Sequence, residues 1–281
     1  MKNLTIIEQQ DWNYFTFYDN AFDTILREFD GFEFADVRES IDDVAGPYGS
    51  VYINSKFGRR RVSIKGDLLG DSVFTKRRLL SKALRQTGVI KLVKFTTYDD
   101  LNLQFEAEVV KVVNPYTHMI HTFLIEMVAP DWRFYSQDLT SQNVGQTNIQ
   151  GGGMIPAEIP MSIASPSGLS NMVSNIITNN GNEVTDPVIT LTGPGTNFTI
   201  GNQTTGDTFT LTYALVGGDS VVIDVKSRTI VLNNTTNLYP YITGDLWSLA
   251  PGQNELRFSV SSGLTADTNL NISYRDAYSG I

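Results

Sequence analysis

Hydrophobic and polar residues alternate along much of the first half of the chain. Two runs show this most clearly: Val62, Ile64 and Leu68, and then Leu103, Phe105, Ala107 and Val109. Because successive side chains of a strand point to opposite faces, a period of two predicts β-strands that bury one face. Two further runs, 88–98 and 117–130, are more continuously apolar and predict more deeply buried strands.

One segment of the first half has a helical pattern instead and predicts a helix from about Thr75 to Thr87, ended by Gly88. At 100° per residue, its apolar and its mainly basic side chains occupy opposite arcs. The apolar arc holds Leu79, Leu80, Ala83 and Leu84, and the other holds Arg77, Arg78, Ser81, Lys82 and Arg85. We expect the apolar arc to pack on a sheet and the basic arc to face solvent.

The second half is strand-like throughout. Strands are expected at 187–193, 197–202, 207–216, 220–226 and 228–233, with Gly, Asn or Asp at each break, and 169–186 predicts an earlier strand pair around Asn179-Asn180-Gly181. The connections at Gly217-Gly218-Asp219 and Lys226-Ser227 are hairpin-sized. The end of the chain predicts a closing hairpin, with Leu256, Phe258 and Val260 on one strand and Leu270, Ile272 and Tyr274 on the next. Short strands at this spacing favour an antiparallel sandwich.

A chain of 281 residues suggests two domains. Residues 136–154 are polar and contain three consecutive glycines, which is typical of a linker or an exposed loop, so we place the boundary near residue 150. The fold class expected is therefore mainly β, with one sandwich at 1–150 that carries the single helix and a second at 151–281. The first half holds 17 basic and 20 acidic residues, whereas the second holds only 4 basic and 10 acidic ones.

Charge is also segregated within the first half. Residues 8–43 contain 11 acidic and 2 basic side chains, and residues 59–94 contain 11 basic and 2 acidic ones. The net charge of −9 and the pI near 4.7 argue against a nucleic-acid binder, which normally carries a basic domain. Two interpretations stay open: the runs pair within the chain or are merely solvated, or they form a subunit interface. The candidate interface residues are Arg59, Arg60, Arg61, Arg77, Arg78, Lys82 and Arg85.

Residues suited to catalysis or metal binding are scarce. The chain has no Cys, and its two histidines, His118 and His121, are three apart in an expected strand and so point to opposite faces. No G-x-S-x-G motif is present, and the paired acids Asp42-Asp43 and Asp99-Asp100 are typical of solvated loops. We therefore expect no catalytic site, no cofactor, no metal and no enzymatic activity. No segment has the length of a membrane span, and the start lacks the pattern of a signal peptide.

Several phrases occur in an order that resembles one protein family. GPYGSVYINSKFGRRRVSIKGDLLG (46–70) precedes the helix, and the strands that follow the helix end at AP-x-W (Ala129 to Trp132). P-x-I-x-L-x-G (187–193), GD-x-V-x-I-D (218–224), L-x-P-G-x-N-x-L-x-F (249–258) and N-x-x-Y-R-x-x-Y-x-G (271–280) follow. Together they resemble the distal tail protein (Dit) family of siphophages, in its plain form without an inserted carbohydrate-binding module.

The resemblance implies a ring-forming N-terminal domain and a galectin-like C-terminal domain. It also implies a homohexameric ring at the distal end of the phage tail, made in the host cytoplasm before it enters the virion. Such a ring joins the major tail tube protein to the tail-tip or tail-associated lysin protein. It also anchors receptor-binding or baseplate proteins and leaves a lumen through which DNA passes, with no membrane partner.

A glycan-binding adhesin is the alternative function. Tyr213, Tyr239, Tyr241 and Trp247 could stack on sugars if the sandwich exposes them. Galectins, however, bind sugar with a set that includes His, and the second half contains no His. Because a shared fold does not carry a function, core or interface roles are favoured for these aromatic residues.

Overall fold

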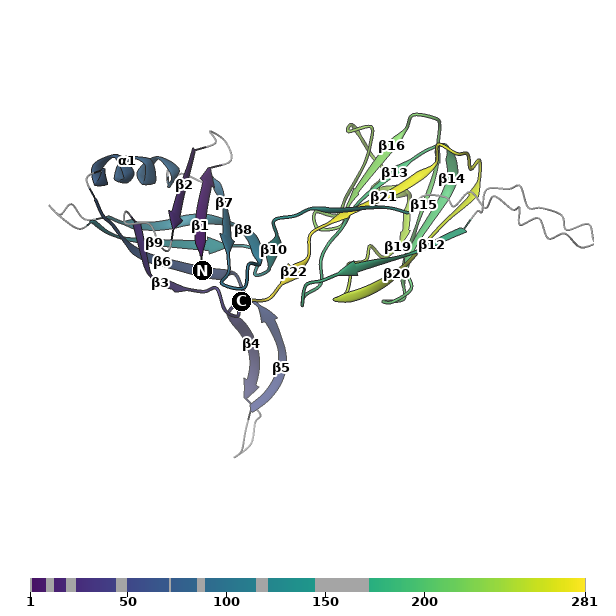
Figure 1. The fold of residues 1–281 in the computed structure, drawn as a ribbon. Helices are drawn as coiled ribbons and strands as arrows, with labels where there is room; N and C mark the ends of the chain where they lie inside the picture. Colours follow the sequence, from purple (N-terminus) through teal and green to yellow (C-terminus); the bar gives the residue numbers. More distant parts are fainter. Residues whose placement is uncertain are drawn as a thin grey trace, which may run out of the picture. The chain divides into compact units, whose positions relative to one another are not determined.

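The computed structural model describes residues 2–8, 13–18, 24–43, 50–70, 72–84, 89–114, 121–144 and 172–280. The chain divides into two compact units, Met1–Asp138 with Ala277–Ile281, and Leu139–Asp276. The expected boundary near residue 150 lies outside the described residues, and the chain passes into the second unit before it, after Asp138. Each unit is mainly β, as expected, and the helix lies in the first (Figure 1).

The core of the first unit is one nine-stranded antiparallel sheet. Its main path runs β2-β1-β7-β8-β9-β6-β3, with β10 beside β8 and β22 beside β10. These strands are β1 Asn3–Glu8, β2 Asn13–Tyr18, β3 Thr24–Asp30, β6 Arg60–Leu68, β7 Ile90–Thr96, β8 Asn102–Val113, β9 His121–Ala129, β10 Phe134–Ser136 and β22 Ala277–Tyr278. The ends of the path, β2 and β3, also come into contact, so one continuous sheet curves around the core and supplies both of its layers.

The expected alternation holds in this sheet. Val62, Ile64 and Leu68 of β6 are buried, as are the four predicted apolar positions of β8. The runs at 88–98 and 117–130 form β7 and β9, but they alternate between buried and half-buried residues and bury fully on one face only. Both strands therefore bury one face, as the other strands of this sheet do.

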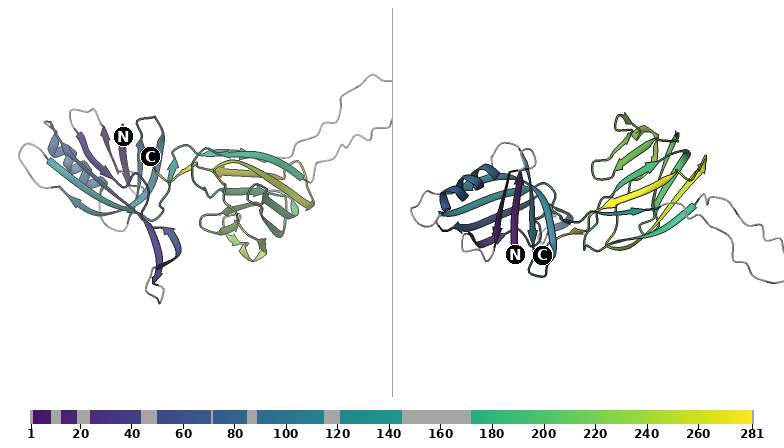
Figure 2. Two further views of the ribbon diagram at one scale, coloured as in Figure 1. Left: turned by 90° about the horizontal axis from the view of Figure 1, so that it is seen from below. Right: turned by 45° about the horizontal axis from the view of Figure 1, so that its top comes forward.

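Helix α1 covers the core side of this sheet. It spans Val73–Ala83, ends earlier than the predicted Thr87, and packs against β1, β2 and β6 (Figure 2). Residues 85–88 lie outside the described residues. Leu80, Ala83 and Leu84 are buried as predicted, but Leu79 is about half exposed and the expectation for it is wrong. The helix starts two residues earlier than the pattern indicated, and Val73 occupies the apolar face instead.

The C-terminal residues complete the first unit. After leaving the second unit, the chain adds β22 to the sheet by pairing Phe134 with Tyr278 and Tyr135 with Ala277. A side chain on Gly280 would meet the carbonyl oxygen of Glu33 at 2.3 Å, so the tail lies tightly against that segment. Gly31 is equally constrained: it has a φ of +82° and its position leaves no room for a Cβ, which would lie 1.9 Å from the Arg61 carbonyl oxygen.

The second unit is a sandwich of two antiparallel sheets. One has the order β11-β21-β13-β16-β17-β18 and the other β12-β20-β14-β15-β19. The strands are β11 Thr140–Asn143, β12 Met172–Asn179, β13 Val188–Thr192, β14 Gly195–Asn202, β15 Asp207–Leu215, β16 Ser220–Asp224, β17 Thr229–Leu232, β18 Thr236–Asn237, β19 Ile242–Gly244, β20 Gly252–Ser262 and β21 Asn269–Tyr274. A short 3₁₀ helix, η1 (Tyr239–Tyr241), precedes β19. The sandwich is confirmed, and its closer likeness to galectin stays a prediction.

Two predicted hairpins of this unit are wrong, although their strands are right. β20 and β21 lie in different sheets, as do β15 and β16, so neither pair is hydrogen-bonded together. The connections cross from one sheet to the other, whereas the Lys226-Ser227 turn does join a paired hairpin, β16–β17. The pair expected within 169–186 is a single strand, β12, which pairs with β20.

The polar segment that we expected to be a linker contributes to both units. β10 and β11 lie within 134–143, and β11 pairs with β21 as the edge strand of its sheet. Its residues, Thr140 to Asn143, carry no large apolar side chain, so hydrophobic periodicity could not reveal a strand there. The glycines at 151–153 lie outside the described residues.

Candidate assembly surfaces

A two-stranded hairpin projects from the first unit and belongs to none of its other sheets (Figure 1). Its strands are β4 (Val37–Asp43) and β5 (Ser50–Phe57). Every side chain described in it, from Val37 to Ser40 and from Ile53 to Phe57, is exposed. Among the described residues, both of its edges lack a strand partner. An isolated two-stranded hairpin is marginally stable in water, and open edges readily pair with another chain.

The exposed side chains of the hairpin and its approach include several large apolar ones. Ile53 is 55% exposed, and Phe34, Val37 and Phe57 are also exposed. Only Phe57 has a ring contact within the unit, stacked on Trp132 with centroids 4.1 Å apart. That contact lies at the base of the hairpin, and the other apolar side chains named here are at least half exposed.

Sequence reasoning missed this hairpin as a candidate surface. Its strands contain the same mixture of apolar and polar residues as strands that bury one face. The hairpin's second strand lies within the 46–70 phrase. That phrase supported the family resemblance but did not indicate that these side chains are exposed.

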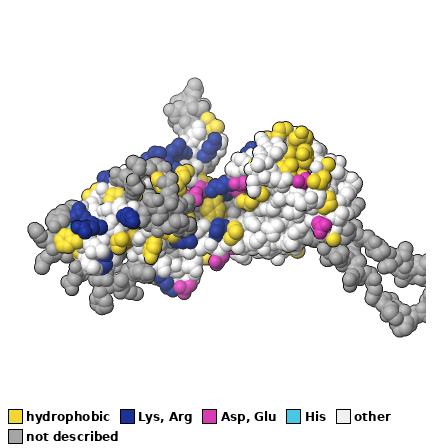
Figure 3. All heavy atoms as spheres, turned by 90° about the horizontal axis from the view of Figure 1, so that it is seen from above, with side chains coloured by type: hydrophobic (Ala, Val, Ile, Leu, Met, Phe, Trp, Pro, Cys, Tyr) yellow, Lys and Arg dark blue, Asp and Glu magenta, His cyan; other side chains and the backbone are white. Residues whose placement is uncertain are grey.

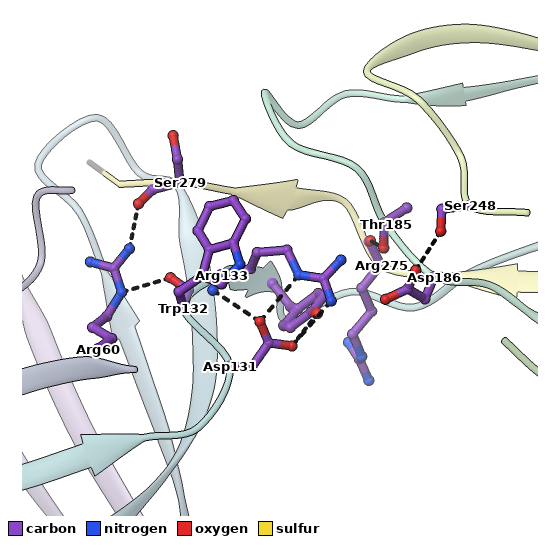
Figure 4. Close-up of polar contacts among 10 residues, drawn as sticks. Arg60, Asp131, Trp132, Arg133, Thr185, Asp186, Ser248, Arg275 and Ser279 are labelled. Carbon is purple, nitrogen blue, oxygen red and sulfur yellow. Dashed lines mark hydrogen bonds and ion pairs between the residues drawn. The ribbon is translucent and has the colours of Figure 1, made fainter. Parts of the chain in front are cut away.

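Arg60 is the clearest correction to the predicted interface residues. It is only 1% exposed, whereas an interface role requires a surface position. Its guanidinium donates hydrogen bonds to the carbonyl oxygens of Gly31 (2.7 Å), Glu33 (2.8 Å) and Trp132 (2.8 Å), and a fourth to that of Ser279 (Figure 4). One buried side chain therefore joins three segments of the first unit that are far apart in sequence.

The surroundings of Arg60 explain how a cation is accommodated there. Its guanidinium lies 4.0 Å from the centroid of the Phe134 ring, a favourable cation–π arrangement. Burial lowers the pKa of Arg60 from its ordinary value to about 10, and the negative charge of Asp131 partly opposes this shift. Asp131 itself is held by Arg133, with Nε at 3.1 Å, and by the hydroxyl of Tyr135 at 2.6 Å (Figure 4).

The remaining described basic residues of the predicted set form two groups on opposite sides of the sheet. Arg59 and Arg61 are exposed and line a pocket of about 420 Å³ on its outer face. Asp30 and Glu126 line the same pocket, so acidic side chains accompany the cations there. Arg78 and Lys82 are exposed on α1, which covers the core side.

Arg77 and Arg85 have different outcomes. Arg77 is half-buried, and its guanidinium donates a hydrogen bond to the Asn114 carbonyl oxygen at 2.9 Å, which ties the helix to the end of β8. Arg85 lies outside the described residues. Apart from the buried Arg60, a shared interface for the predicted set stays a prediction, and Arg78 and Lys82 are exposed members of it on α1.

The acidic and basic runs also meet within the chain. β3 from the acidic run pairs antiparallel with β6 from the basic run. Lys65 forms an ion pair with Glu28 at 3.2 Å, and Arg27 forms one with buried Asp67. The intrachain interpretation therefore applies to this part of the two runs. In the face shown in Figure 3, basic side chains gather mainly on the first unit, and the second is largely uncharged.

The expected lack of a chemical centre can be examined only in the described part. There, no group of three or more His, Asp or Glu residues is arranged to hold a metal, and no helix is long and apolar enough to cross a membrane. His121 is buried with its ring against Phe74, and His118 lies outside the described residues. The Thr97 hydroxyl donates to Asp99 and lowers the pKa of that carboxyl, while Asp100 pairs with Lys2. No side-chain description covers Asp42 and Asp43.

The aromatic residues of the second unit divide between core and surface. Trp247 is buried and its indole N–H donates to the Ile200 carbonyl oxygen at 3.2 Å, so it cannot stack on a sugar. Tyr213 packs edge-on against Tyr241, with centroids 5.1 Å apart. Tyr239 and Tyr241 are about half exposed.

Polar contacts fix the ends of the second unit's strands. The Thr185 hydroxyl donates to the Arg275 carbonyl oxygen at 2.6 Å, and the Ser248 hydroxyl to the Asp186 carboxylate at 2.6 Å (Figure 4). These contacts anchor the chain beside β21 where it leaves the unit, and they offer no arrangement of nucleophile and base.

Comparison with known proteins agrees with this architecture. Residues 180–278 match the family described as siphovirus-type tail component, C-terminal domain. The crystal structure of the SPP1 Dit protein, described as a paradigm of the hub adsorption apparatus of phages that infect Gram-positive bacteria, is similar over 98% of both chains. The TM-score is 0.65 at 14% sequence identity. Two structures of the phage P2 baseplate in its activated conformation, with Ca and with Sr, each cover 96% of this chain and 97% of theirs. Their TM-scores are 0.49 and 0.46, at 12% and 14% identity. A search of curated proteins finds no match.

Proposed function

We propose that this protein works as the hub at the distal end of a phage tail. The proposal rests on its second unit, in which residues 180–278 match the distal tail protein (Dit) family of structural phage-tail components. The match of residues 180–278 to this family supports a structural role and not an enzymatic one. In the proposed arrangement, copies of the chain form a ring of six subunits with a lumen for DNA. The ring connects the tail tube to the tail-tip or tail-associated lysin protein, and its second units hold receptor-binding or baseplate proteins. Synthesis in the host cytoplasm precedes incorporation into the virion.

The single observation that carries the ring is the β4–β5 hairpin. All of its described side chains are exposed, and they include large apolar residues such as Ile53. Exposed apolar surface of this kind is typical of an interaction site, and a two-stranded hairpin gains stability when another surface covers it. A neighbouring copy of the chain is the occupant that we propose.

Ring closure requires two different surfaces on each subunit. In a cyclic ring larger than a dimer, contacts are head-to-tail, so a projecting element on one subunit meets another region of the next. The hairpin supplies the projecting element, and the two open edges of the nine-stranded sheet's path, β2 and β3, lie elsewhere on the unit. The hairpin therefore suits a heterologous contact better than a self-matching one.

The test is a matched pair of substitutions in the full-length protein. Ile53→Asp places a charge on the hairpin, and Ile176→Asp places one on the second unit at a similarly exposed isoleucine (55% and 57%). Native mass spectrometry and negative-stain images should show rings for the wild type and for Ile176→Asp, and folded monomers for Ile53→Asp. Rings of normal abundance from Ile53→Asp would refute the hairpin contact, and a monomeric wild type at all concentrations tried would refute the ring.

Charge should influence how fast the ring forms. Arg78 and Lys82 are exposed on α1, whereas Arg59 and Arg61 share their pocket with Asp30 and Glu126, whose charges partly offset theirs. We therefore expect Arg78→Glu with Lys82→Glu to slow assembly and Arg59→Glu with Arg61→Glu to have little effect. Long-range attraction acts mainly on association rate, so the difference between the helix variant and the wild type should shrink as salt rises. Equal assembly rates for both variants and the wild type at every salt concentration would eliminate the electrostatic interface.

A further inference from the structure

A shallow pocket of about 280 Å³ lies on the second unit, and its lining includes none of the residues used in the ring proposal. It is lined by Arg228, Thr229, Val231, Asn237, Tyr239 and Pro240. Ile230 and Leu232 of β17 are buried in the core, so Thr229 and Val231, which alternate with them along the strand, face outward. Asn237 of β18 lies directly opposite Val231, and η1 forms the remaining wall.

The backbone at Arg228 is unusual for an arginine. Its φ is +54°, in the left-handed region that favours Gly and Asn. The chain uses asparagine for the same conformation at Asn233 and Asn234, in the next turn. Among the described residues, none accepts a hydrogen bond or forms an ion pair with the Arg228 guanidinium. The turn thus holds a long cationic side chain where a smaller residue would suit the backbone better, and that side chain lines the pocket.

Charge around the pocket contrasts with the rest of the second half. Residues 151–281 contain 4 basic side chains against 10 acidic ones. Two of the four, Lys226 and Arg228, are in this turn. A planar guanidinium presents paired donors that match a carboxylate or a phosphate. The ligand group nearest Arg228 should therefore be an anion.

The other end of the pocket suits a ring with hydroxyl groups. Tyr239 is 48% exposed, and an aromatic face beside a proline offers a rigid apolar platform at low entropy cost. Asn237 accepts a hydrogen bond from the Tyr239 backbone N–H at 2.9 Å, which orients its side-chain oxygen and keeps its NH₂ group as a donor. The Thr229 hydroxyl adds a group that can donate or accept. A few oriented polar groups around an apolar wall are typical of small-molecule sites.

We propose that this pocket binds one sugar unit that carries a carboxylate or phosphate group. Arg228 contacts the anion, Tyr239 stacks on the sugar ring, and Asn237 and Thr229 bond its hydroxyls. From the sequence alone, a core or interface role was favoured for Tyr239. The proposal gives it a ligand-binding role instead, because residue types alone could not predict that this pocket exists. It does not depend on ring assembly, since all six residues come from one subunit.

Saturation-transfer difference NMR on the full-length protein tests the site. The probes are glucuronic acid and glucose 6-phosphate, with glucose as the neutral control and inorganic phosphate as a competitor. We expect signals from either acidic sugar, at least about tenfold weaker binding of glucose, and no displacement by an equal concentration of phosphate. Tenfold is the effect of about 1.4 kcal/mol, in the range of one hydrogen bond to a charged group.

Two variants locate the binding. Arg228→Gly suits the local backbone and should fold normally while reducing affinity for the acidic sugars at least about tenfold, as should Tyr239→Ala. Lys226→Ala, in the same turn but outside the lining, should bind as the wild type does. Thermal unfolding of each variant verifies folding. Equal binding of glucose, displacement by phosphate alone, unchanged binding in Arg228→Gly, or no signal from either acidic sugar would each overturn the proposal.

Discussion

Arg60 allows a sharp prediction about what holds the first unit together. The substitution Arg60→Met keeps much of the aliphatic volume and removes the guanidinium. Four backbone carbonyls then lose their donor, in the segments around Gly31 and Glu33, at Trp132 and at Ser279. We expect the free energy of unfolding of the first unit to fall, and the C-terminal tail to loosen most.

The magnitude follows from two opposing effects. Hydrogen bonds from charged donors contribute roughly 1.5 kcal/mol each at the low end of their range, so four amount to about 6 kcal/mol. Burial of the cation works against this, because lowering the pKa of Arg60 from its ordinary value to about 10 corresponds to about 3 kcal/mol. The variant is relieved of that cost. The expected net loss is therefore roughly 3 kcal/mol.

Urea unfolding followed by hydrogen exchange and mass spectrometry measures this unit by unit. For a slope near 2 kcal/mol per molar, the midpoint of the first unit should fall by roughly 1.5 M, and the second unit should be unaffected. Arg59→Met is the control, because the neighbouring arginine is exposed and its loss should change stability by less than about 0.5 kcal/mol. If the two variants unfold at the same urea concentration, the four bonds do not stabilise the unit and the reasoning is refuted.

Three further predictions follow from local geometry. Gly31→Ala should cost more than about 2 kcal/mol in thermal or urea unfolding, because a backbone oxygen lies 1.9 Å from the new Cβ; Gly206→Ala has a similar φ but open space and should cost only about 1 kcal/mol. The fragment 139–276 should unfold cooperatively on its own, with a β-type circular dichroism spectrum, since it has its own core. The pKa of Asp219 lies below its ordinary value because its carboxylate accepts hydrogen bonds, mainly from the Val216 backbone N–H and secondly from the Asn233 side chain. Asn233→Gly should therefore raise it in an NMR titration, and the stability that this carboxylate provides is lost as pH falls through its folded pKa.

The sequence predicted which side chains face the core better than which strands pair. All six apolar residues assigned to the closing hairpin are buried, but β20 and β21 lie in opposite sheets. Alternation reports the direction of a side chain relative to a core. The inner faces of both sheets point to the same core. A strand therefore has the same pattern of apolar and polar residues whichever sheet it belongs to. Glycine-containing connections of hairpin length can also cross between sheets, as Gly217-Gly218-Asp219 does.

The candidate site was predictable only in part, for a related reason. Arg60 and Arg61 are adjacent in sequence and look equivalent, yet one is buried and the other faces solvent. Their directions follow from the strand period, because Val62 is buried and Arg60 lies two positions before it. The partners that make a buried arginine tolerable, such as Ser279, come from segments that no local pattern relates to it.

Two of the phrases that carried the family resemblance contain residues that fix the backbone. Asn254 of the L-x-P-G-x-N phrase is buried and accepts the Ala250 N–H at 2.9 Å while donating to the Ala250 and Gly252 carbonyls, which closes the turn before β20. In the terminal phrase, the Tyr274 hydroxyl donates to the Thr178 carbonyl at 2.8 Å, and Gly280 occupies a space that admits no side chain. These residues determine the path of the chain, so resemblance through them identifies the fold. The residues of the pocket beside Arg228 lie outside all of these phrases, so the resemblance carries no information about that pocket. The hairpin differs in this respect, because its strand β5 lies within the 46–70 phrase.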